Sequence, residues 1–247
     1  MTLLKAALLT GSSKKDRPRR ETLRSQRVRG LKPSKDKFAN HLLVLASGSP
    51  RRFSLLAQIG IEPTAIRPVS INETPKPFEL PRSLAQRLAR TKAKATIHQI
   101  MNDNELAHAY VLAADTVVSI GRRVLSKPTH IEDALACLEL LSGRSHRVTT
   151  NICLITPDDR IRTRSIETRV QFRILSTKDV ETYIATREWY GKAGGYAIQG
   201  VAGCFVQKLI GSYTNVVGLP LTETAALLKG EGLPIHYGWL DAADVEL

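Results

Sequence analysis

Two arginines follow a turn of small residues at the end of an apolar segment, a combination that can bind an anion. Residues 42–52 read LLVLASGSPRR. Ser49 is a suitable N-cap and Pro50 suits the first position of a helix. The free N–H groups and positive dipole end of that helix would then point at the turn, beside the guanidinium groups of Arg51 and Arg52. The pattern predicts a phosphate site, with an ordinary capped helix and solvated arginines as the alternative.

A carboxylate in the most apolar segment is the second candidate. Asp115 stands within AADTVV, where an ionised side chain is costly unless a metal, a lysine or bound water compensates it. We expect a catalytic base or metal ligand facing a cleft. A structural carboxylate paired with a core arginine or backbone amides is the alternative. Lys127 and Glu73, in predicted loops, could bring an ammonium and a second carboxylate to the cleft, where Glu73 could share a divalent cation with Asp115.

A glycine-rich segment forms the third candidate. Residues 191–200 read GKAGGYAIQG, which matches neither the Walker A pattern nor the dinucleotide fingerprint in its strand-turn-helix context. The glycines favour tight turns and close backbone approach to a ligand. The amide of Gln199 both donates and accepts hydrogen bonds, so it could read the edge of a nucleobase. A turn-rich connection with a surface glutamine is the alternative.

Alternating strands and helices must position these residues. Apolar runs predict strands near residues 42–45, 64–69, 110–120, 146–156, 161–175 and 204–210, with a hairpin arm at 124–125. Helical spacing and capping signals predict helices from residue 50 and near 81–100, 131–141, 177–186 and 220–229. In the helix at 81–100, Leu84, Leu88 and Ala95 share one face and Lys92 is expected elsewhere. The pattern implies an α/β fold with a mixed sheet.

Composition limits the class of protein. A chain of 247 residues can form one large domain or two lobes around a shared cleft, and 43% hydrophobic residues suit a globular protein. No apolar run reaches the roughly 20 residues that span a bilayer. Cys137, Cys153 and Cys204 are isolated and lack metal-ligand spacing. We expect buried thiols in a reducing compartment, in agreement with a cytoplasmic location.

The net charge of +13 is concentrated at the start of the chain. Residues 1–40 hold 12 Lys or Arg and 3 Asp or Glu, whereas the remainder holds 24 and 20. We expect residues 1–40 to be a disordered basic extension, 41–235 to be the folded domain and 236–247 to be a C-terminal tail. The extension could contact nucleic acid or target an organelle. It could also be solvated without a function, or follow from a start codon assigned too early.

Together these segments resemble the Maf family of nucleoside triphosphate pyrophosphatases, from about Leu42 to Leu228. The resemblance is carried by the order and spacing of SGSPRR at 47–52, ADTV at 114–117, KP at 127–128, LSGRSH at 141–146, residues 191–200, and the segments GSY at 211–213 and VGLP at 217–220. It implies a two-lobed α/β fold similar to inosine triphosphate pyrophosphatases. A mixed twisted sheet, flanking helices and an active site in a central cleft are expected.

The resemblance also implies hydrolysis of a nucleoside triphosphate to the monophosphate and pyrophosphate with Mg²⁺ or Mn²⁺, in a homodimer. Asp115 matches the family's proton acceptor. Arg51, Thr116 and Gln199 match positions that separate substrate subgroups, and Thr116 with Gln199 looks like the subgroup acting on dTTP and UTP. Phosphate binding is expected of Ser49, Arg52, Lys92 and Lys127, and metal binding of Glu73 and Asp115.

One departure from the family concerns the expected metal site. The family often reads Asp-Ile-Asp-Glu before and at position 73, whereas this chain reads Ser70-Ile71-Asn72-Glu73. Two carboxylates are therefore missing from the loop.

Two other functions remain open. One is nucleic-acid binding through residues 1–40, although the small net charge of the remainder and the lack of a recognised nucleic-acid module argue against it. The other is non-enzymatic regulation of cell division, a role linked to some relatives of the family. Neither nucleic acid nor a membrane is expected as a partner.

Overall fold

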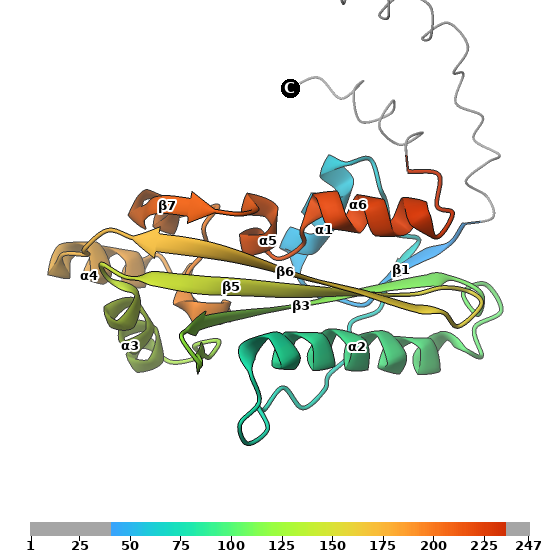
Figure 1. Cartoon of the computed structure of the whole chain (residues 1–247), viewed down its shortest axis with the longest axis horizontal. Coiled ribbons are helices and arrows are strands. Elements are labelled where there is room, and N and C mark those ends of the chain that lie inside the picture. Colours follow the sequence, from blue (N-terminus) through green and yellow to red (C-terminus); the bar gives the residue numbers. More distant parts are fainter. Residues whose placement is uncertain (1–40, 236–247) are drawn as a thin grey trace, which may run out of the picture. The chain divides into compact units, whose positions relative to one another are not determined.

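The described part of the chain, residues 41–235 of a computed structural model, forms one mixed β-sheet with helices on both faces (Figure 1). The strand order is β2-β1-β3-β5-β6-β7, and β4 pairs with β3. Residues 1–40 and 236–247 lie outside the described part, as do the expected basic extension and C-terminal tail.

The sheet combines two pairing directions. Strand β1 is parallel to β2 and β3, and every other pairing is antiparallel. The strands are β1 (Leu43–Leu45), β2 (Ala65–Ile66), β3 (Tyr110–Ile120), β4 (Arg123–Leu125), β5 (Ser145–Ile155), β6 (Ile161–Phe172) and β7 (Val206–Ile210). Since β1 stands between its two parallel neighbours, its carboxyl end is a topological switch point, where open α/β sheets bind ligands.

The helices pack on the sheet from both sides. They are α1 (Pro50–Gln58), α2 (Pro81–Ile100), α3 (Ile131–Leu141), α4 (Thr177–Ala185), α5 (Tyr213–Val217) and α6 (Leu221–Gly230), with 3₁₀ turns η3 (Ala193–Gly195) and η4 (Val201–Phe205). Helix α2 covers one face of the long strands and α6 the other (Figure 1). None of the helices in residues 41–235 is long and apolar enough to cross a membrane.

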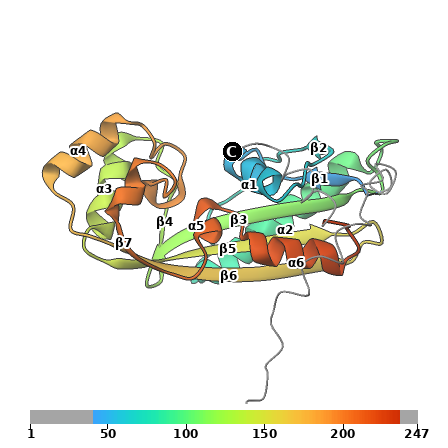
Figure 2. The same ribbon diagram turned by 90° about the horizontal axis from the view of Figure 1, so that it is seen from above.

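The helices gather in two groups at opposite ends of the long strands. Helices α3 and α4 lie with β7 at one end, and α1, α2 and α6 lie with β1 and β2 at the other (Figure 2). Strands β3, β5 and β6 run through both groups, and one core cluster includes Leu138 from α3 and Leu228 from α6. The structure therefore confirms a mixed α/β fold with two lobes.

Four elements differ from the expected ones. Strand β6 ends at Phe172 and not at the expected residue 175. Strand β2 is only Ala65–Ile66, because Pro63 and Pro68 flank it and proline has no N–H for the ladder. Strand β7 begins at Val206, after the 3₁₀ turn that occupies part of the expected strand. Helix α5 has five residues, too few to give a helical hydrophobic pattern in the sequence.

Two expectations about burial are wrong. Lys92 is buried on α2, because it follows the core residue Leu88 by four positions and so shares its face. Cys204 is exposed, because it stands in the 3₁₀ turn that precedes β7, whereas Cys137 and Cys153 are buried as expected.

The glycine at position 194 provides a test of how closely the glycine-rich segment packs against β3. Gly194 has a φ of 72°, and a Cβ there would lie 2.8 Å from Val118 Cγ1 on β3. We expect Gly194→Ala to lower the free energy of unfolding by about 2–4 kcal/mol, because left-handed strain adds to overpacking. Gly121 has a φ of 58° and a Cβ there would meet nothing within 4 Å, so this position isolates the strain.

Gly121→Ala should therefore cost only about 1–2 kcal/mol. Urea unfolding of both variants measures the difference. Equal losses would show that Gly194 does not pack closely against β3.

Candidate active site

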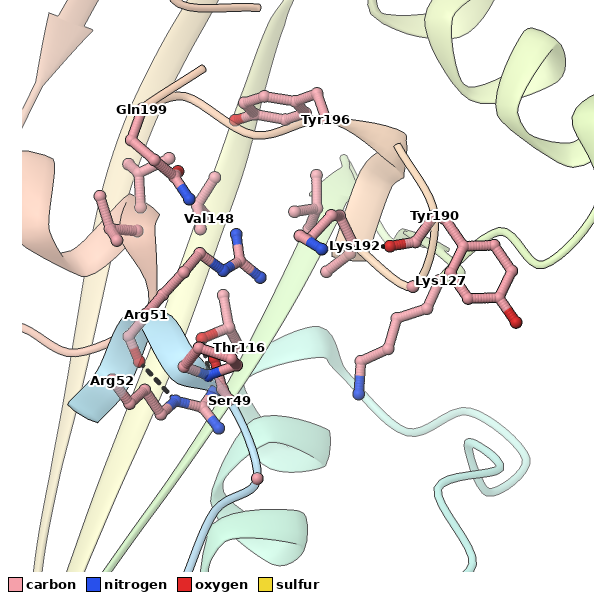
Figure 3. Close-up of a pocket in the computed structure, with 18 residues that line it drawn as sticks. Ser49, Arg51, Arg52, Thr116, Lys127, Val148, Tyr190, Lys192, Tyr196 and Gln199 are labelled. Carbon is pink, nitrogen blue, oxygen red and sulfur yellow. Dashed lines mark hydrogen bonds between the residues drawn. The ribbon is translucent and has the colours of Figure 1, made fainter. Parts of the chain in front are cut away.

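A cavity of about 440 Å³ lies where α1, β3, α5 and the glycine-rich segment meet (Figure 3). Its polar lining consists of Ser49, Arg51, Arg52, Thr116, Lys127, Tyr190, Lys192, Tyr196 and Gln199. Among the described residues that line it, none is Asp or Glu. The cavity thus has four cationic side chains and no acidic one.

Thr116, which lines the cavity, lies in a stretch of β3 that is unpaired along one edge. Strand β1 pairs with β3 only as far as Leu45 and Leu112, and β4 begins pairing at Val118. Residues 113–117 therefore have no strand on that side within the described chain. Side chains from both faces of β3 can approach this open edge, where β1 ends and α1 begins.

The N-terminus of α1 faces the cavity as the sequence predicts. Ser49 is the N-cap and Pro50 takes the first helical position, but the Ser49 hydroxyl makes no capping hydrogen bond. Arg51, in the first turn, makes no side-chain hydrogen bond with the described residues, and burial together with the neighbouring charge of Arg52 lowers its pKa. A lowered pKa means that the cation lacks compensation, which an anion in the cavity would supply.

Arg52 is held by three neutral oxygen atoms. Its Nε donates to Gly218 O at 2.8 Å, Nη1 to Ser47 Oγ at 2.9 Å and Nη2 to Thr116 Oγ1 at 3.1 Å. Burial lowers its pKa, although the charge of nearby Asp115 acts in the opposite direction. Because no carboxylate binds this guanidinium directly, its positive charge stays available while its orientation is set.

The hydroxyl of Thr116 has its only proton committed. Thr150 Oγ1 donates to Asn215 O at 3.0 Å, and the hydroxyls of Thr150 and Thr116 are 2.9 Å apart. Thr116 must therefore donate to Thr150 while it accepts from Arg52. It can offer only a lone pair to a ligand.

Asp115 lies on the opposite face of β3, against α2. Its Oδ1 accepts from Lys92 Nζ at 2.5 Å, and the same ammonium lies 2.6 Å from Glu73 Oε1. Lys127 Nζ donates to Glu73 Oε2 at 2.6 Å and also lines the cavity. Two carboxylates and two ammoniums therefore alternate from buried Asp115, 2% exposed, to the cavity wall.

Glu73 is held in its charged form by the two lysines. Burial raises its pKa, but hydrogen bonds from Lys127 and Lys92 outweigh that effect and lower the pKa to about 2. Both of its oxygens are occupied by ammonium groups, whereas the Oδ2 of Asp115 accepts no hydrogen bond from the described residues.

The glycine-rich wall of the cavity is tied to β5 by a buried pair. His146 Nε2 and Tyr196 Oη are 2.8 Å apart, and Tyr196 lines the cavity. Burial lowers the pKa of His146 to about 4, so the imidazole is neutral at neutral pH. The same segment is joined to the loop of Lys127, because Gly191 N donates to Pro128 O at 2.9 Å.

The structure thus separates the expected site residues into two sets. Those lining the cavity are Ser49, Arg51, Arg52, Thr116, Lys127 and Gln199. Asp115, Lys92 and Glu73 lie behind this lining, joined to it through Lys127. The expectation that Asp115 faces the cleft is therefore wrong, because the alternation of side chains along β3 turns it toward α2. Sequence reasoning missed Tyr190, Lys192 and Tyr196 as lining residues, although all three stand in or beside the glycine-rich segment.

The carboxylates of the site could bind a divalent cation only together with oxygen atoms of a bound ligand. No group of three or more His, Cys, Asp or Glu residues within 41–235 could hold a metal ion. Asp115 offers one free oxygen, and Glu73 is bound to lysines. This donor set suits Mg²⁺ held by one or two carboxylates together with phosphates and water, and does not form an all-protein cage.

Known proteins match this chain over nearly all of its described residues. A family model described as Maf-like protein matches residues 42–231. A dTTP/UTP pyrophosphatase of Nitrobacter winogradskyi is 62% identical over 200 residues, which cover 81% of this chain and 97% of that protein. A protein of the same name from Bradyrhizobium diazoefficiens is 59% identical over 202 residues, covering 82% and 97% of the two chains.

Solved structures show weaker similarity. The Ham1 protein of Staphylococcus aureus is 15% identical with a TM-score of 0.37, covering 53% of this chain and 71% of that one. A nucleoside-triphosphatase (dITP/XTP pyrophosphatase) of Mycobacterium abscessus is 17% identical with a TM-score of 0.32, covering 53% and 72%.

The pH dependence of the stability of Glu73→Gln tests the ion pairs of Glu73 with Lys92 and Lys127. A carboxyl whose pKa is depressed from 4.5 to about 2 stabilises the fold fully above pH 4.5, and loses this contribution as the pH falls toward 2. We expect the variant to have a lower free energy of unfolding than the native chain at pH 7. This difference should narrow steadily below about pH 5. Urea unfolding between pH 7 and pH 3 measures it.

Glu62→Gln is the matched control, since Glu62 is exposed and makes no side-chain hydrogen bond with the described residues. It should behave like the native chain throughout. A gap for Glu73→Gln that stays constant down to pH 3 would contradict the assignment of these ion pairs.

Proposed function

The chain belongs to the Maf family, and we propose that it is a nucleoside triphosphate pyrophosphatase that hydrolyses dTTP and UTP to the monophosphate and pyrophosphate. The observation that carries the proposal is the cavity with four cationic side chains and no acidic lining residue. A strongly anionic ligand such as a triphosphate compensates those charges. The names of relatives about 60% identical over nearly their whole length support the same substrates.

The phosphates are bound by side chains at the start of α1 and by a lysine on the opposite side of the cavity. Arg52 is pre-oriented by its three hydrogen bonds, and the Ser49 hydroxyl beside it makes no capping bond. Lys127 lies across the cavity from Arg52 (Figure 3). Such donors stabilise the negative charge that grows on the phosphoryl oxygens and on the leaving pyrophosphate. Lys92 does not line the cavity, so we give it the role of positioning Asp115.

Asp115 acts as the general base in this proposal. Lys92 holds one carboxylate oxygen and leaves the other without a partner among the described residues. The side chain is adjacent to the open edge of β3, whose next residue, Thr116, lines the cavity. Asp115 removes a proton from a water, the water oxygen attacks the α-phosphorus, and the α–β anhydride bond breaks. General-base help of this kind is worth about 10²–10⁴-fold in rate.

A divalent cation, Mg²⁺ or Mn²⁺, would be held by Asp115 together with the substrate's phosphates, and would supply neutralisation of phosphate charge. Glu73 could contribute only after one of its lysine ion pairs opens, because both of its oxygens are occupied.

Base selection falls to Gln199, with Thr116 and Arg51. Gln199 is exposed and its amide makes no hydrogen bond with the described residues. An amide both donates and accepts, which suits a thymine or uracil edge with two carbonyls and one N–H. Thr116 has no proton to donate, so its contribution is to accept a hydrogen bond and to orient Arg52.

A cytoplasmic location and a homodimeric state complete the proposal and rest on the family resemblance. The two rival functions, nucleic-acid binding through residues 1–40 and non-enzymatic regulation of cell division, are favoured by no feature of the described residues.

Asp115→Asn tests the activity and its base together. The fold should survive, because Lys92 keeps Glu73 as a partner. Pyrophosphate release from dTTP and UTP should fall about 10²–10⁴-fold, because an amide cannot take the proton. The measurement is pyrophosphate released from a panel of pyrimidine and purine nucleoside triphosphates with Mg²⁺ or Mn²⁺, alongside thermal unfolding.

Near-native turnover by a folded Asp115→Asn variant would remove Asp115 from the base role. If the native chain released pyrophosphate from none of the nucleotides, the proposed function itself would be wrong.

Gln199→Glu tests base selection. A carboxylate cannot donate to a pyrimidine carbonyl and repels it, so kcat/KM should fall about tenfold or more with UTP and less with purine nucleotides. Gln86→Glu is a suitable control, since Gln86 is exposed on α2 and lies outside the cavity lining. Equal losses of Gln199→Glu across all nucleotides would deny Gln199 a part in reading the base.

A further inference from the structure

The four cations of the cavity are not equally available to a ligand. Lys127 is paired with Glu73 at 2.6 Å, and Arg52 donates to three protein oxygens. Arg51 makes no side-chain hydrogen bond with the described residues. Lys192, the remaining cation, makes one hydrogen bond, from Nζ to the carbonyl of Tyr190 at 3.2 Å.

Lys192 has no carboxylate partner in the described chain. Glu188 is the acid close enough to influence its charge, but both carboxylate oxygens of Glu188 accept from Val201 N, at 3.2 and 2.9 Å. Burial and the charge of Arg51 lower the pKa of Lys192. The ammonium is thus half-buried beside a second cation and lacks a counter-charge.

The backbone delivers this side chain to a defined place. Lys192 N donates to Trp189 O at 3.1 Å, and Gly195 N donates to Lys192 O at 2.9 Å. The preceding Gly191 is joined to Pro128 O. In Figure 3, Lys192 and Arg51 enter the cavity from opposite walls, one from the glycine-rich segment and one from α1.

Two cations that approach each other without an acid between them repel, and the repulsion is strongest where water is partly excluded. The arrangement becomes favourable when an anion occupies the space between them. A chain of linked phosphates presents several anionic oxygens and can accept from both walls at once.

We propose that Lys192 is a phosphate-binding residue that, with Arg51, clamps the oligophosphate chain of the substrate across the cavity. The inference rests on the proposed function for the identity of the substrate. The clamp itself requires only an oligophosphate, whether free or attached to a nucleoside. It also assigns the glycine-rich segment a role in binding phosphate, in addition to the role of Gln199 in reading the base.

The test compares Lys192→Gln with Lys192→Arg in the full chain. Titration calorimetry with inorganic triphosphate should show a Kd about tenfold higher for Lys192→Gln, the size of one charge-assisted hydrogen bond. KM for UTP should rise by a similar factor while kcat changes little. Lys192→Arg, which keeps the charge, should stay near the native values in both measurements.

Lys208→Gln is the matched control, because Lys208 is exposed on β7 and does not line the cavity. It should leave Kd and KM unchanged. Thermal unfolding confirms that each variant is folded, and Lys192→Met provides a second neutral variant if Lys192→Gln is not.

A folded Lys192→Gln or Lys192→Met that binds inorganic triphosphate as tightly as the native chain would overturn the clamp, even if nucleotide hydrolysis were observed. Equal weakening by Lys192→Arg and Lys192→Gln would also overturn it, because charge would then not matter. A third outcome separates the two proposals. If the native chain hydrolysed no nucleotide but Lys192→Gln still weakened its binding of inorganic triphosphate, the clamp would be supported and the proposed function refuted.

Discussion

The alternation of side chains along the unpaired edge of β3 is the constraint on which the site depends. Asp115 and Thr116 are neighbours, so the pleat sends them to opposite faces of the sheet. On the α2 face, Asp115 meets Lys92, and the acid charges of that face are neutralised by two lysines. On the other face, Thr116 accepts a hydrogen bond from Arg52, and no acidic side chain of the described residues lines the cavity. Because one strand separates Asp115 from Arg51 and Arg52, the cavity stays basic next to a carboxylate that pairs with neither arginine.

The cavity is largely assembled before a ligand arrives. Arg52 is oriented by three hydrogen bonds, and Tyr196 is held by neutral His146 from β5. Donors that are already in place do not need to reorganise when charge develops on a phosphate, which is the source of much electrostatic catalysis. The cations with the fewest protein partners, Arg51 and Lys192, are then the ones free to follow the ligand.

Much of the scaffold could be predicted from local signals. The bounds of α2 match the expected helix at both ends, because Pro81 marks the start and no glycine or further proline interrupts the segment before Ile100. The cation-bearing start of α1 follows from a proline at the first helical position. The face on which Asp115 lies could not be predicted, since it depends on where β1 and β4 stop pairing with β3. Lys192 was missed for a related reason: its lack of a counter-charge is a property of the assembled walls.

The claim that the acid-free cavity is the nucleotide site is tested most directly by a crystal structure of the chain with a UTP analogue whose α–β bridge cannot be hydrolysed. We expect phosphate oxygens within hydrogen-bonding distance of Arg52 and between Arg51 and Lys192, with the α-phosphate at the open edge of β3 beside Asp115. A phosphate chain bound on another surface, with the cavity filled only by water, would contradict it.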